Sequence, residues 1–130
     1  METLRLAAAP ESPALARRFV AGCLRRWGLG HRVDDAELLT SELVTNAVRF
    51  AGPPVLVRVD QAADGVIVAV QDPEPALPAP RSAAPDDVSG RGLAIVAAMA
   101  ADWGVDPVPD DGKAVWFRLT IPEPDVGNPP

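Results

Sequence analysis

Residues 34–53 carry the sequence D-D-A-E-L-L-T-S-E-L-V-T-N-A-V-R-F-A-G-P, and its boundaries are those of one long helix. Asp34 is a suitable N-cap, because its short carboxylate can accept a backbone N–H that the first turn leaves unpaired. Glu37 stands three residues later, as in a capping box. At the other end, Gly52 tolerates the left-handed closing turn and Pro53 cannot continue the helix.

Two stripes run along this helix. The apolar stripe, at spacings of four, four and three, consists of Leu39, Leu43, Ala47 and Phe50. Beside it lies a polar stripe of Glu42, Asn46 and Arg49. Residues four apart project from the same face, so Glu42 and Asn46 stand together at the edge of the core stripe. An amide oxygen can ligate a hard cation such as Mg²⁺, and a carboxylate can orient or deprotonate a nucleophile. Taken alone, such a pair is more often a solvated helix face than a site.

Composition limits the class of protein. The length of 130 residues suits one domain, and 48% hydrophobic residues exclude a disordered chain. No apolar run approaches the ~20 residues that span a bilayer, and the N-terminus lacks a signal peptide. We therefore expect a cytoplasmic protein without a membrane anchor.

Charge and metal-binding residues exclude further classes. The net charge of −6 disfavours direct nucleic-acid binding. The local basic cluster, interpreted as a solvated helix face, is Arg17, Arg18, Arg25 and Arg26. The single Cys23 and single His31 argue against zinc chemistry and Cys/His catalysis, and we expect Cys23 to be a small core residue.

The first half of the chain predicts a strand over 3–6 and a helix that begins with Ser12 as its cap and Pro13 in its first turn. The apolar stripe expected for that helix is Leu15, Phe19, Cys23 (with Leu24) and Trp27. After the 34–53 helix, alternation in 54–60 and the nearly all-apolar run 66–70 predict a hairpin around Asp64-Gly65, with 66–70 as a central buried strand.

The second half predicts a strand-end acid, a long loop and a final hairpin. Asp72 follows the apolar run 66–70, and the proline-rich loop 73–90 fits no regular element. A third helix opens at Ser89-Gly90-Arg91-Gly92, with an apolar side consisting of Leu93, Val96 and Met99. Glycines at a helix start suit either phosphate binding or plain helix geometry. The last strands are 103–108, interrupted by Pro107, and 113–121, joined by a turn at 110–112.

This order predicts an α+β fold with two layers: one mostly antiparallel sheet, covered on one face by about three helices. Residues 1–122 are expected to form a single domain, and 123–130 a flexible proline-rich tail.

Four separated motifs, in this order, resemble the GHKL ATP-binding superfamily (the Bergerat, or histidine-kinase-like ATPase, fold). Residues 40–51, T-S-E-L-V-T-N-A-V-R-F-A, match its N box, and Asp72 matches the start of the next box. Residues 90–93, G-R-G-L, match the glycine-containing box, and 112–116 together with Trp103-Gly104 resemble the closing hairpin. Over about residues 3–121 the chain is similar to small stand-alone anti-sigma-factor and switch-protein serine/threonine kinases, particularly actinobacterial ones.

The resemblance implies a role for each matching residue. Asn46 would ligate the Mg²⁺ that bridges the ATP phosphates, and Glu42 would orient or deprotonate the attacking hydroxyl. Asp72 would accept the adenine amino group, and about 73–90 would form the ATP lid. Backbone N–H groups to the phosphates would come from Gly90, Arg91, Gly92 and Leu93. The implied substrate is a serine or threonine on an anti-sigma-factor antagonist, with a sigma factor as a second partner, and the family often forms homodimers.

Two departures from the family pattern keep rival functions open. The family commonly has glycines just after the strand-end acid, as in D-x-G-x-G, whereas residues 72–78 here read D-P-E-P-A-L-P. Lys113-Ala114 stands in a region where many members carry an adenine-holding threonine. The first rival is a catalytically impaired partner-binding module with weak or no ATP binding. The second is the catalytic domain of a sensor histidine kinase, which we disfavour because no dimerisation helix or phospho-accepting histidine segment precedes the domain.

Overall fold

The helices and strands occur in the predicted order. A computed structural model describes residues 1–74 and 88–121, so residues 75–87 of the expected lid and the expected tail 123–130 lie outside the described residues. The elements are β1 (Glu2–Leu6), α1 (Ser12–Arg26), the 3₁₀ turn η1 (Gly30–Arg32), α2 (Val33–Phe50), β2 (Val55–Ala62), β3 (Gly65–Asp72), α3 (Val88–Met99), β4 (Asp102–Val108) and β5 (Gly112–Thr120).

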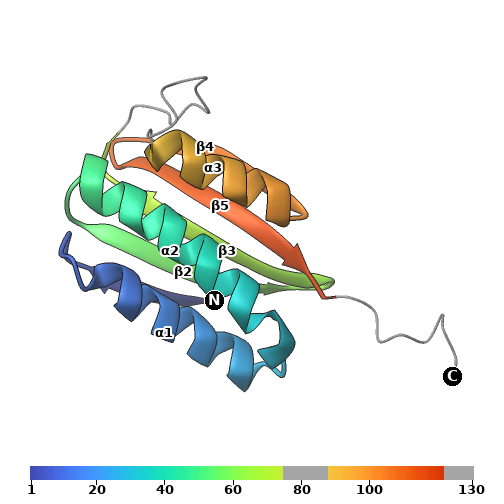
Figure 1. The fold of residues 1–130 in the computed structure, drawn as a ribbon. Helices are drawn as coiled ribbons and strands as arrows, with labels where there is room; N and C mark the ends of the chain where they lie inside the picture. Colours follow the sequence, from blue (N-terminus) through green and yellow to red (C-terminus); the bar gives the residue numbers. More distant parts are fainter. Residues whose placement is uncertain (75–87, 122–130) are drawn as a thin grey trace, which may run out of the picture.

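The five strands form one sheet in the order β1-β2-β3-β5-β4, and every neighbouring pair is antiparallel. Helices α1, α2 and α3 lie side by side on one face of it (Figure 1). The two-layer α+β prediction is therefore confirmed. Short hairpins join β2 to β3 and β4 to β5, while α3 lies between β3 and β4 in the chain, so that β5 becomes the neighbour of β3.

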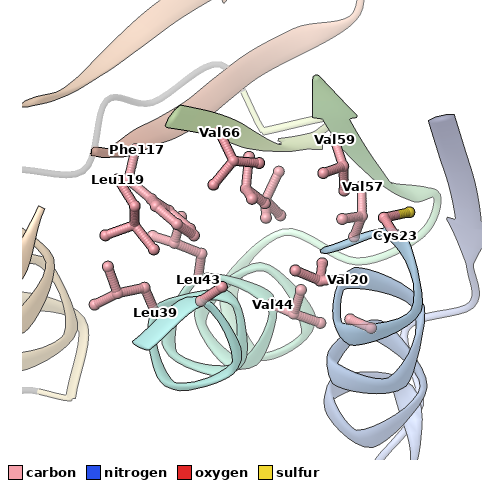
Figure 2. Packing of buried hydrophobic residues seen from close by; sticks show 14 of the residues in the cluster. Val20, Cys23, Leu39, Leu43, Val44, Val57, Val59, Val66, Phe117 and Leu119 are labelled. Atoms are coloured by element: carbon pink, nitrogen blue, oxygen red, sulfur yellow. The ribbon is translucent and has the colours of Figure 1, made fainter. Parts of the chain in front are cut away.

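The core lies between the helices and the sheet (Figure 2). Alternate residues of the central strand β3 point into it, namely Val66, Val68 and Val70, as do Val115, Phe117 and Leu119 of β5. From the helix side, Leu39, Leu43 and Ala47 of the predicted stripe are buried, and its fourth member, the Phe50 side chain, lies outside the described part of the structure. Each buried Val, Leu or Phe contributes about 1.5–3 kcal/mol to the free energy of unfolding. This packing fixes the rotation of α2 about its axis.

The predicted N-caps of α1 and α2 are both wrong. Helix α2 begins at Val33, and no side-chain hydrogen bond caps it, so Asp34 lies in its first turn. The physical reason is that the 3₁₀ turn η1 runs directly into α2 and supplies the helical entry without a cap. Helix α1 begins at Ser12, whose hydroxyl instead donates to the carbonyl of Ala7 and accepts from the N–H of Ala9.

The apolar faces of α1 and α3 also differ from the prediction. Of the predicted α1 stripe, Leu15 is 40% exposed, while Phe19 and Trp27 are partly buried against the core. The buried face of α1 also includes Ala16 and Val20, which were not predicted, beside Leu24. Cys23 is buried as predicted, and burial raises the pKa of its thiol. Met99, the last residue of α3, is 36% exposed because the helix ends there. No helix in the described ranges is long and apolar enough to cross a membrane.

Strand β4 continues through Pro107 instead of being interrupted there. Pro107 pairs in register with Lys113 of β5. β4 is the last strand of the sheet, where a proline without an N–H donor is tolerated. The β4–β5 turn is at the predicted place, with Asp110 and Gly112 at positive φ.

Candidate functional site

The candidate site lies at one end of the sheet, where four segments meet. These are the C-terminal half of α2, the end of β3, the start of α3 and the β4–β5 turn (Figure 1). Helix α2 contacts both β3 and α3. The antiparallel register of β3 with β5 places Asp72 opposite Lys113. Three segments that carry predicted site residues are therefore gathered at the same end of the domain.

Glu42 and Asn46 stand one turn apart on α2 and are both half-buried. The neighbouring residues Leu39, Leu43 and Ala47 are held in the core, so the pair occupies the edge of the core as predicted. Next to Glu42, the Ser41 hydroxyl accepts a 2.9 Å hydrogen bond from the guanidinium of Arg17 on α1. Arg17 is half-buried and ties α1 to α2, so it is not part of a solvated basic face.

The amide oxygen of Asn46 is one of three buried side-chain atoms that lack a hydrogen-bond partner in the described part of the chain, beside Thr40 Oγ1 and Arg32 Nε. Oδ1 is buried, and within the described residues it has no hydrogen-bond partner. Leaving a buried polar atom unpaired costs about 1–3 kcal/mol, so such an atom calls for a functional explanation. A free amide oxygen is a suitable ligand for Mg²⁺, which commonly takes one or two protein oxygens and completes its shell with water and substrate phosphates. Residues 1–74 and 88–121 contain no cluster of three or more His, Cys, Asp or Glu side chains that could hold a metal by themselves.

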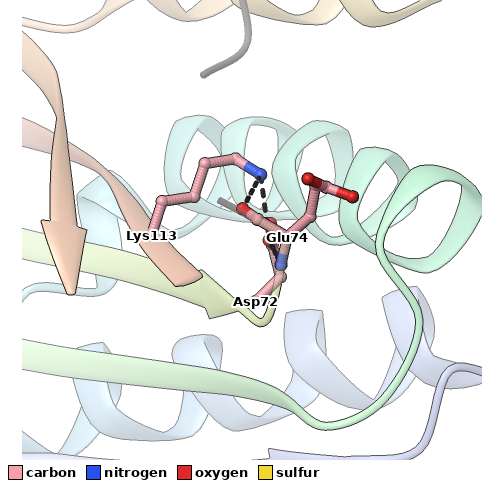
Figure 3. Close-up of polar contacts among 3 residues, drawn as sticks. All are labelled: Asp72, Glu74 and Lys113. Atoms are coloured by element: carbon pink, nitrogen blue, oxygen red, sulfur yellow. Dashed lines mark hydrogen bonds and ion pairs between the residues drawn. The ribbon is translucent and has the colours of Figure 1, made fainter. Parts of the chain in front are cut away.

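Asp72 ends β3 and is almost fully buried, with 5% of its surface exposed. Its Oδ1 accepts a 2.9 Å hydrogen bond from the N–H of Glu74. The same oxygen accepts a 2.9 Å bond from Nζ of Lys113, which also donates to the Glu74 carbonyl at 3.0 Å (Figure 3). Lys113 is itself only 7% exposed. The predicted base-reading acid is therefore part of a buried ion pair.

Sequence reasoning missed this role of Lys113. Its signal was present, because Lys113 is in phase with Val115, Phe117 and Leu119, which all point into the core. A charged side chain on that face requires a buried partner of opposite charge. That partner, Asp72, could be identified only once the pairing register of β3 and β5 was known.

Gly112 allows β5 to approach the end of β3 closely. Its φ is +94°, and a Cβ added there would lie 2.0 Å from the carbonyl oxygen of Asp72 and 2.6 Å from atoms of Pro73. We expect Gly112→Ala to lower the free energy of unfolding by roughly 3 kcal/mol, combining about 1–3 for the strained φ with about 1–3 for overpacking. Urea denaturation measures this loss.

Two other glycines provide controls for that substitution. Gly28 has φ +76° with nothing within 4 Å of an added Cβ, so Gly28→Ala should show the cost of the strained φ alone. Gly30 has open space and no positive φ, so Gly30→Ala should change stability by a few tenths of a kcal/mol, roughly. A loss at Gly112 no larger than that at Gly28 would contradict the close approach of β5 to β3.

The predicted phosphate-binding residues lie at the start of α3. Because α3 begins at Val88, Gly90 and Arg91 are among its first four residues, whose N–H groups lack partners inside the helix. Gly92 and Leu93 follow directly, and the Leu93 side chain is buried in the core. The free N–H groups and the helix dipole both favour an anion at this end. The role of these four residues in phosphate binding stays a prediction.

Comparison with known proteins agrees with this arrangement. A family model described as a histidine kinase-like ATPase domain matches residues 6–119. That range contains α1, α2, α3 and nearly all of the sheet, including every residue of the candidate site. A search of curated proteins gives no match.

Proposed function

The chain belongs to the histidine kinase-like ATPase family, and we propose that it is an ATP- and Mg²⁺-dependent serine/threonine protein kinase. Membership of the family implies ATP binding, while the protein acceptor is our inference. The observation that carries the proposal is the pair on α2: Glu42 and Asn46 lie one turn apart, and the Asn46 amide oxygen is buried without a partner among the described residues. Metal-assisted phosphoryl transfer requires an oxygen ligand for the metal and an acidic side chain that orients or deprotonates the attacking hydroxyl, and this pair offers both.

The proposed chemistry assigns one task to each residue. Asn46 Oδ1 would hold Mg²⁺, which when bound neutralises charge on the phosphates. Glu42 accepts the proton of the attacking hydroxyl as that oxygen bonds to the γ-phosphorus. The bond from this phosphorus to the β,γ-bridging oxygen breaks, and ADP leaves. Asp72 accepts a hydrogen bond from the adenine amino group, and the start of α3 binds the phosphates.

The proposed acceptor is a serine or threonine on an anti-sigma-factor antagonist, and a sigma factor is a second proposed partner. This choice rests on the resemblance of the motifs to small anti-sigma-factor kinases. The net charge of −6 supports regulation through protein contacts instead of direct nucleic-acid binding. We propose the cytoplasm as the place of action, because ATP is available there, and a homodimer as the assembly.

A second candidate function is a partner-binding module that has weak or no ATP binding. The observation that favours it is the engagement of Asp72 by Lys113, together with Pro73 directly after the acid. In such a module the fold would present a surface to a partner, and nucleotide would make no difference to partner affinity.

Thermal unfolding with and without Mg²⁺-ATP separates the two functions. A ligand at about 100 times its dissociation constant adds about 2.7 kcal/mol to the free energy of unfolding. For a domain of this size we expect the melting temperature to rise by roughly 10 °C. No shift at millimolar Mg²⁺-ATP would contradict the kinase and favour the module. If the shift is seen, incubation with γ-³²P-ATP and an antagonist protein tests the acceptor.

A further inference from the structure

The Lys113 ammonium is held in a fixed position at the candidate site. It is the single lysine in a chain whose other basic residues, besides His31, are all arginine. Its ammonium is held by Asp72 Oδ1 at 2.9 Å and by the Glu74 carbonyl at 3.0 Å. The two side chains of the ion pair are 8% and 6% exposed. Strand register and the glycine at 112 both place this ammonium at the end of β3.

Stability alone gives little reason for this ion pair. Moving two charges out of water costs free energy that their attraction only partly returns, and a well-packed apolar pair of the same size is often at least as stable. The pair therefore needs another explanation, and it lies where the proposed function puts the nucleotide base.

The ion pair changes which purine bases can form hydrogen bonds with the site. An ionised Asp72 alone only accepts hydrogen bonds, so it suits the 6-amino group of adenine and repels the 6-oxo oxygen of guanine or hypoxanthine. Lys113 adds up to three N–H donors beside it, of which the described contacts use two. Neither of those contacts involves Asp72 Oδ2. A 6-oxopurine offers an acceptor at O6 and a donor at N1–H, which match Lys113 and Asp72 respectively.

We propose that Lys113 and Asp72 together read the purine edge, so that the protein accepts 6-oxopurine nucleoside triphosphates as well as ATP. This inference rests on the proposed nucleotide-binding function and adds the substrate class. Adenine remains acceptable, because its amino group donates to Asp72 and its N1 accepts from Lys113. The 2.9 Å contact already places a donor and an acceptor side by side for either base.

Inosine triphosphate is the sharpest probe, because it differs from ATP only at position 6 and the adjacent N1. Calorimetry with Mg²⁺ should give wild-type dissociation constants for the two nucleotides within about tenfold of each other. Lys113→Met removes the ammonium donor from both bases, but the adenine amino group keeps Asp72 as its acceptor, whereas the 6-oxo oxygen is left beside a carboxylate that repels it. The preference for ATP should therefore grow roughly ten- to hundredfold. Lys113→Gln keeps a neutral donor and should retain much of the wild-type tolerance.

A second readout needs no variant and covers the case that Lys113→Met, in which the buried Asp72 loses its counter-ion, does not fold. Labelling lysine with ¹³C at Cε gives one signal in NMR spectra, because the chain has one lysine. We expect saturating Mg²⁺-ATP and Mg²⁺-ITP each to move the Lys113 Cε resonance.

The outcomes separate this inference from the proposed function. Wild-type protein that binds ATP but discriminates against ITP by more than about a hundredfold would overturn the inference and leave the kinase intact. An unchanged ATP/ITP ratio in folded Lys113→Met, or a Lys113 signal that stays in place at saturation, would also overturn it. If neither nucleotide binds, the proposed function fails, and the inference fails with it.

Discussion

Asn46→Ala should abolish the thermal stabilisation that Mg²⁺-ATP gives the wild-type protein. The reason is the position of Oδ1, which is buried and, among the described residues, without a hydrogen-bond partner. If this oxygen is a metal ligand, its removal leaves the phosphate-bound Mg²⁺ without its contact to α2. We expect the rise in melting temperature, roughly 10 °C in the wild type at saturation, to fall to near zero at the same nucleotide concentration.

The apo protein provides an internal check on this result. Alanine is the best helix former, and the substitution removes a buried polar atom that has no partner in the described structure. Without ligand, Asn46→Ala should therefore be as stable as the wild type or slightly more stable. A variant that loses both its stability and its response would indicate a structural role for the side chain.

Asn46→Asp is the matched control, because it retains an oxygen ligand of the same length and adds a charge. The melting temperature of Asn46→Asp should still rise with Mg²⁺-ATP, and this rise should disappear when EDTA removes the metal. A full wild-type response in Asn46→Ala would rule out Asn46 as the metal ligand.

The fold could be predicted from local patterns. The apolar run 66–70 and the alternation in 113–121 predicted strands β3 and β5, and the apolar spacing in 34–53 predicted the buried stripe of α2. These patterns are short-range, because each strand or helix determines its own periodicity. The N-caps could not be predicted in the same way, because the start of α2 depends on the preceding turn η1.

The residues of the candidate site also divide into those that local sequence predicts and those that depend on long-range contacts. Glu42 and Asn46 follow from spacing within one helix, and Asp72 follows from its place after an apolar run. The partner of Asp72 does not follow, because Lys113 lies 41 residues further along the chain and meets it only through the β3–β5 register. The buried, unpaired state of Asn46 Oδ1 likewise depends on how α2 packs against the rest of the domain.

Glu42→Gln should reduce phosphoryl transfer by about 10²–10⁴-fold while nucleotide binding is retained. Glutamine keeps the shape of the side chain on α2 but cannot accept the hydroxyl proton. Binding is expected to persist, because in the proposed site the metal contact comes from Asn46 and the base contact from Asp72. Single-turnover transfer from γ-³²P-ATP to an antagonist protein measures the rate, and the Mg²⁺-ATP thermal shift measures the binding.

Glu37→Gln is the matched control for this substitution, since it makes the same chemical change on the same helix at a half-buried position outside the proposed site. It should leave both the transfer rate and the thermal shift at wild-type values. A Glu42→Gln rate within a few-fold of the wild type would exclude Glu42 as the base. Loss of the thermal shift together with the rate would instead assign Glu42 to nucleotide binding, and the proton acceptor would then have to be sought on another element.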